Sequence, residues 1–133
     1  MAFEQLDPAA YGLPADWLAR VQSPALVVHL DIVRGNLARV LALCGGDAAR
    51  WRVHVKSSKI PRVLRELAAV GLRHFKCATT RELAVLLETL AAEGLEDPDV
   101  LLAYPLVGPG LARVAELASR HPRAKLSILC SRS

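Results

Sequence analysis

The segment 51–59, with the sequence WRVHVKSSK, carries the side chains of this chain that are best suited to chemistry. Arg52, His54 and Lys56 alternate there with two valines. Because strand side chains alternate between faces, the pattern predicts a strand with one apolar face and one basic face. A lysine that is crowded by cations and partly desolvated loses its proton more readily, and its neutral amine attacks an aldehyde to form a Schiff base. Lys56 is therefore the candidate nucleophile. The competing interpretation is an exposed edge strand whose charges face solvent.

The elements around this segment alternate between apolar β-type runs and helical periodicity. Residues 1–22 form an irregular lead-in, and residues 23–133 are expected to form one domain. Asp31, Ser58 and Thr79 are the expected helix N-caps, with a capping box at Thr79, while Gly45 and Gly71 are expected to follow helix ends. The pattern predicts five strands, at 24–30, 52–56, 72–77, 99–104 and 125–130, and four helices, at 31–43, 58–71, 79–90 and 111–119.

This alternation is typical of a parallel α/β sheet, in which strands are buried on both faces. The strand 52–56 should then be internal, which argues against the exposed-edge interpretation. Ligands of parallel α/β folds bind at the carboxyl ends of strands, and Lys56 lies at such an end. An open doubly wound sheet and part of a (β/α)8 barrel both fit the pattern. The turn after the first strand, LDIVRG, has no GxGxxG or Walker loop.

The composition and charge of the chain argue against several classes of protein. The 133 residues are 53% hydrophobic, and 17 basic against 13 acidic side chains give a net charge of +4. No basic tract is interleaved with aromatic residues, which argues against nucleic-acid binding. No apolar run is long enough to span a membrane, and no signal peptide is evident, so the cytoplasm is the expected location. Cys44, Cys77 and Cys130 have no CxxC spacing, so no metal site or disulfide framework is predicted.

Four segments, taken in order, resemble a known family. The segment 23–31, followed by Asn36, resembles the first strand and helix of fold-type III pyridoxal 5′-phosphate (PLP) enzymes, which share the alanine racemase N-terminal barrel. The segment 52–59 is similar to the Arg-Pro-His-x-Lys-Thr-His-Lys motif of the D-threonine aldolase and D-serine dehydratase branch. The segments 75–82 and 103–108 are similar to the third-strand segment and the fourth-strand loop of that branch. The resemblance implies the N-terminal part of a PLP-binding (β/α)8 TIM-type barrel.

The resemblance also implies roles for particular residues. Lys56 would hold PLP and move the proton at the substrate Cα, while His54 and Arg52 would supply positive potential to the anionic cofactor. His54 could instead be a packed histidine, and Tyr104 would either line the same site or anchor the loop after it through its hydroxyl. Lys59 is expected at the surface.

The implied activity is that of a PLP-dependent lyase, aldolase or racemase acting on a D-amino acid, in a homodimer. Ser58 and Val53 replace the second histidine and the proline of the motif, which leaves the substrate open. A full barrel takes roughly 250 residues, so we expect this chain to be an N-terminal fragment with little activity alone. The divalent metal of this branch is bound in its C-terminal part, and no ligands for it are visible here. Two alternatives remain, a non-catalytic PLP-binding homeostasis protein and an α/β interaction module without cofactor.

Overall fold

The computed structural model describes residues 11–130. Within this range, four parallel strands form one sheet in the order β1-β2-β3-β4. The strands are β1 (Val53–His54), β2 (His74–Cys77), β3 (Asp99–Pro105) and β4 (Lys125–Leu129). The helices are α1 (Ala15–Leu18), α2 (Leu30–Leu43), α3 (Pro61–Ala69), α4 (Thr80–Ala92) and α5 (Pro109–Arg120), with short 3₁₀ helices η2 (Ala48–Arg50) and η3 (Val55–Ser57).

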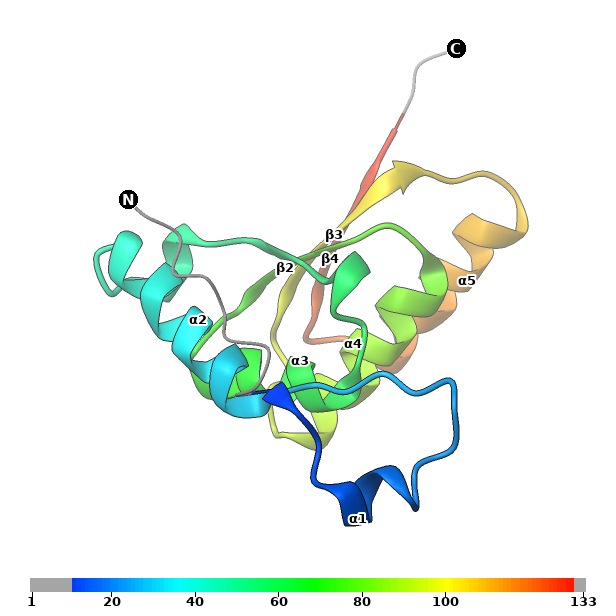
Figure 1. The fold of residues 1–133 in the computed structure, drawn as a ribbon. Coiled ribbons are helices and arrows are strands. Elements are labelled where there is room, and N and C mark those ends of the chain that lie inside the picture. Colours follow the sequence, from blue (N-terminus) through cyan, green and yellow to red (C-terminus); the bar gives the residue numbers. More distant parts are fainter. Residues whose placement is uncertain (1–10, 131–133) are drawn as a thin grey trace.

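The helices from α2 to α5 follow one another along one side of the sheet. Each contacts the next, α2 with α3, α3 with α4 and α4 with α5, and Figure 1 shows them as an arc around the strands. Right-handed crossovers between strands in sequential order place every connecting helix on the same face. A doubly wound sheet carries helices on both faces. The observed arrangement is therefore that of an α/β fold consistent with part of a β/α barrel.

Strand register separates the two faces of the sheet. In a parallel sheet, residues in register point to the same side, so each row belongs to one face. The row beneath the helices is apolar, and its two central members, Phe75 and Val100, are almost completely buried. The other face has a half-buried row of mixed polarity that no helix of the described chain covers. This second row, which we call the open-face row, consists of His54, Lys76, Leu101 and Ser127.

Two of the predicted helix signals are confirmed. The Thr79 hydroxyl accepts a hydrogen bond from the Glu82 N–H at 3.1 Å, so Thr79 is the N-cap of α4. After α3, the chain passes through Gly71 at a φ of 85°, a conformation that side-chain-bearing residues rarely adopt. Local sequence therefore determines where α4 begins and where α3 ends.

Two predicted caps are wrong. Helix α2 begins at Leu30 with His29 as its N-cap, which places Asp31 in the first turn, where a carboxylate still favours the helix dipole. Helix α3 has Ile60 as its N-cap and Pro61 in its first turn, so Ser58 is not its N-cap and instead follows η3 as the C-cap of that short helix. Proline already has the φ of a helix start, and the N–H that it lacks is one that the first turn of a helix leaves without an intrahelical partner.

The first predicted strand, at 24–30, does not form. No residue of 21–29 belongs to a strand, and the side chain of Leu26 is 80% exposed. An apolar β-type run becomes a strand only when another strand accepts its backbone hydrogen bonds. Residues 11–130 thus contain four of the five predicted strands, and β1 is an edge strand of the described sheet rather than an internal one. The interpretation of residues 52–56 as an exposed edge strand is therefore correct in one respect, because β1 lies at an edge of the described sheet.

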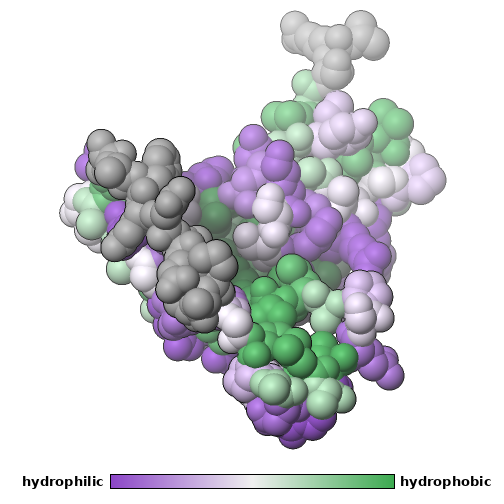
Figure 2. All heavy atoms as spheres, viewed as in Figure 1, coloured by the Kyte–Doolittle hydropathy of each residue, from purple (hydrophilic) through white to green (hydrophobic). Residues whose placement is uncertain are grey.

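The segment before α2 is separate from the sheet. It carries α1 on an arm that extends away from the strands (Figure 1), and its exposed apolar side chains include Trp17, Val21 and Val27. Figure 2 shows hydrophobic side chains gathered in the lower middle of this face, bordered by hydrophilic side chains. No helix among residues 11–130 is long and apolar enough to cross a membrane.

Candidate functional site

Lys56 lies just beyond the carboxyl end of β1. The predicted strand 52–56 ends at His54, and the chain then turns through η3 around the fully buried Val55. The Lys56 backbone N–H donates to Nδ1 of His54 at 3.2 Å, which closes this turn. The Lys56 side chain is exposed, and no carboxylate of the described residues forms an ion pair with it. Lys56 is therefore an accessible amine at the ligand-binding end of a parallel sheet.

His54 lies in the open-face row, directly beside Lys76 of β2. Burial lowers the pKa of His54, and the charges of Lys56 and Lys76 lower it further against an opposing effect of Glu82. A neutral imidazole at pH 7 retains the Nδ1 lone pair that accepts the Lys56 N–H. His54 and the Lys56 backbone are therefore in contact, although the strand whose face the two residues were predicted to share ends at His54.

Arg52 lies in a different part of the sheet. Its Nη1 contacts the Asp99 carboxylate at 2.8 Å and the Phe75 carbonyl oxygen at 3.1 Å. Asp99 is the first residue of β3, and its carboxylate also pairs with Lys125, the first residue of β4, at 3.0 Å. The hydrogen bond from Arg52 is the main reason that the pKa of Asp99 lies below its ordinary value, with Lys125 adding to it and burial opposing it. The guanidinium of Arg52 is thus held at the amino end of the sheet, away from Lys56.

Tyr104 lies near the carboxyl end of β3, where the pairing with β4 shifts register between Leu102 and Pro105. Its side chain is 59% exposed, and within residues 11–130 its hydroxyl has no hydrogen-bond partner. The anchoring bond that the sequence suggested is therefore not formed there. Its position at a strand end is compatible with lining a ligand site, and that role stays a prediction.

Sequence reasoning missed two residues near His54. Lys76 could have been found, because the alternation in the segment 74–77 places it on the same face as His54 once the strands are paired in register. Glu82 was interpreted only as part of the capping box. Its carboxylate is 6% exposed and accepts a hydrogen bond from the Ala78 N–H at 2.9 Å, while Lys59 pairs with it at 3.4 Å. Lys59, predicted at the surface, is mostly exposed but has this buried partner.

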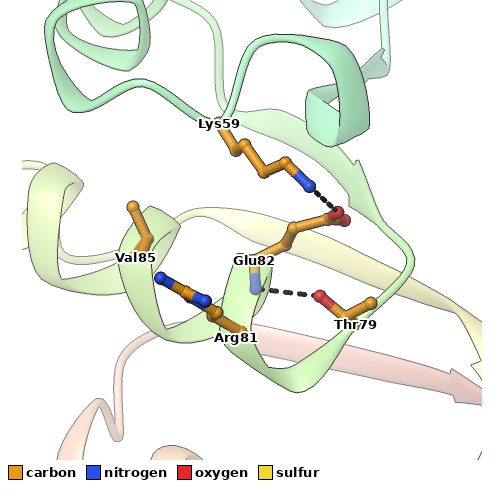
Figure 3. A pocket seen from close by; sticks show the side chains of 5 residues that line it. All are labelled: Lys59, Thr79, Arg81, Glu82 and Val85. Atoms are coloured by element: carbon orange, nitrogen blue, oxygen red, sulfur yellow. Dashed lines mark hydrogen bonds and ion pairs between the residues drawn. The ribbon is translucent and has the colours of Figure 1, made fainter. Parts of the chain in front are cut away.

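Glu82 and Lys59 border a cavity of about 310 Å³ at the start of α4, together with Thr79, Arg81 and Val85 (Figure 3). Burial raises the pKa of the Glu82 carboxyl, but the Ala78 N–H and the Lys59 ammonium outweigh it, so the pKa lies below its ordinary value. Glu82 is thus an ionised carboxylate at neutral pH. It pairs with Lys59, and its negative charge also acts on His54, against the positive charges of Lys56 and Lys76.

The described residues include no group of three or more histidine, cysteine or acidic side chains that could hold a metal ion. Cys77 is completely buried, and desolvation raises the pKa of its thiol to about 12. It is therefore a packed core residue rather than a nucleophile. The chemistry available at this end of the sheet is that of an exposed amine, an imidazole and a second lysine.

The chain was compared with known proteins. No family model matches it. It is 30% identical over 115 residues to the D-threonine aldolase of Arthrobacter sp.. The matched region covers 86% of this chain and 28% of that protein. The chain thus resembles an aldolase over most of its own length while spanning little more than a quarter of the relative.

Proposed function

We propose that this chain carries the cofactor-binding lysine of a PLP-dependent lyase or racemase that acts on a D-amino acid, and that this lysine is Lys56. The similarity to D-threonine aldolase supports the reaction class. The observation that carries the proposal is the position of Lys56, an exposed amine without an ion-pair partner in the described chain, at the carboxyl end of β1.

The side chains present fit this cofactor by their chemistry. PLP supplies, when bound, an aldehyde for a lysine amine and a ring that withdraws electrons from the substrate Cα. Lys56 offers the amine, and Lys76 on the open face adds positive charge that suits an anionic cofactor. Arg52 is paired with Asp99, so we assign it no contact with the cofactor.

Each residue of the site then has a separate task. Lys56 would hold the cofactor and move a proton to or from the substrate Cα. His54 fixes the turn that presents Lys56, because its Nδ1 accepts the Lys56 N–H. Tyr104, at the end of β3, would border the substrate on the other side of Lys76.

Borohydride reduction in the presence of PLP tests the proposal, because it fixes the cofactor on whichever amine it has joined. The chain has four lysines, Lys56, Lys59, Lys76 and Lys125, and peptide mass mapping distinguishes them. We expect the label on Lys56, its loss in Lys56→Arg, and its retention in the matched control Lys125→Arg. Equal labelling of all four lysines would contradict the proposal. Lys56 labelling without any spectral change on adding D-threonine would instead favour a non-catalytic PLP-binding protein.

A further inference from the structure

The feature that the proposed function does not use is the buried carboxylate of Glu82. It accepts the Ala78 N–H at 2.9 Å and pairs with the Lys59 ammonium at 3.4 Å. Figure 3 shows Lys59 reaching down from the connection before α3 to the carboxylate at the start of α4. One side chain thus joins two neighbouring strand–helix connections.

Helix capping alone does not explain this charge. The Thr79 hydroxyl already caps α4, and a neutral glutamine at position 82 could accept the Ala78 N–H equally well. Taking a carboxylate out of water carries a desolvation cost that an uncharged amide avoids. The ionised form of Glu82 therefore has a use beyond capping.

That use lies in the connection between β1 and α3. Lys59 follows Lys56 by three residues, so the ion pair with Glu82 tethers the far end of the turn that presents Lys56. The near end is held by His54, which accepts the Lys56 N–H. The charge of Glu82 also acts on His54 against the charges of Lys56 and Lys76. Both ends of the turn are thus linked to Glu82, one by contact and one by charge.

We propose that Glu82 is a positioning residue for Lys56, which ties the turn carrying Lys56 to α4 through Lys59 and opposes the positive charges that act on His54. This inference rests on the proposed function of Lys56. Its structural content, the tether and the charge balance, can be tested without cofactor.

The test compares Glu82→Gln with Glu88→Gln, a control in the same helix whose carboxylate forms an exposed pair with Arg120. In Glu82→Gln we expect the pKa of His54, measured by NMR titration, to fall further, because a negative charge that favours the imidazolium is lost. We expect exchange of the Lys56 amide hydrogen to accelerate on the order of tenfold, as for loss of one charged hydrogen bond. Glu88→Gln should change neither.

The double variant Glu82→Gln/Lys59→Met keeps an acceptor for the Ala78 N–H and leaves no buried charge unpaired. It replaces the single variant in both measurements if the single variant is poorly folded. A His54 titration and Lys56 amide exchange equal to those of the unaltered chain, in whichever variant is folded, would overturn the inference.

PLP labelling separates the two proposals. Selective labelling of Lys56 that is equally fast in Glu82→Gln would overturn the positioning role and leave the proposed function standing. Unselective labelling of the unaltered chain would overturn the proposed function, while His54 and the Lys56 amide would still report on the tether.

Discussion

The amino end of the sheet offers a sharp test of how burial sets the strength of an ion pair. The Asp99 carboxylate, 17% exposed, meets Arg52 at 2.8 Å and Lys125 at 3.0 Å. Replacing Asp99 with asparagine keeps the shape and removes the charge. A hydrogen bond to a charged group contributes about 1.5–3 kcal/mol and a neutral one about 1 kcal/mol. The Lys125 side chain is 74% exposed, so its pair adds little. We expect Asp99→Asn to lower the free energy of unfolding by about 1–2 kcal/mol.

The pH dependence follows from the direction of the shift. The pKa of Asp99 is depressed in the folded chain, so its stabilisation is complete above the unfolded pKa of about 3.9 and is lost as pH falls through the folded value. Asparagine mimics the protonated form. The difference between the two proteins should therefore be full at pH 7 and shrink steadily below about pH 4.

Urea unfolding followed by circular dichroism measures this difference, with Glu96→Gln as the control. Glu96 pairs with Arg123 at 2.6 Å, but the two side chains are 67% (Arg123) and 54% (Glu96) exposed. Both variants change the net charge equally. The control substitution should lower the free energy of unfolding by no more than about 0.5 kcal/mol. A loss in Asp99→Asn no greater than in the control, or one that persists unchanged at low pH, would refute the reasoning.

Three further predictions concern packing and conformation. Phe75→Ala should destabilise the chain by about 3–5 kcal/mol, since the ring is completely buried beneath the helices; a urea midpoint near that of the unaltered chain would contradict this. Cys77, with its pKa raised to about 12, should resist iodoacetamide at pH 8 in the folded chain while the exposed Cys130 reacts, as mass spectrometry can show. Gly108 precedes α5 at φ 54° and ψ −129°, so Gly108→Ala should cost about 1–3 kcal/mol in urea unfolding, and an unchanged midpoint would argue against strain there.

The sequence predicted those features that depend on residues close together in the chain. The alternation of strands and helices, the Thr79 cap and the turn at Gly71 all follow from hydrophobic period and from the side chain or backbone freedom of one or two residues. The apolar run at 24–30 had the same local signal but did not form a strand. A strand also needs a neighbouring strand to accept its backbone hydrogen bonds, and the described chain provides none there. The resemblance to D-threonine aldolase was likewise visible in short segments, and the comparison agrees with it over most of the chain.

The sequence by itself determined that this is a parallel α/β chain with an amine at the end of its first observed strand. Only the tertiary structure decided what surrounds that amine. Arg52 pairs with a residue 47 positions away, and Lys59 with one 23 positions away. Such pairs depend on strand register and on the packing of neighbouring connections, which no local pattern specifies. The pair with Asp99 holds Arg52 away from Lys56, and the pair with Lys59 links Glu82 to the connection that carries Lys56.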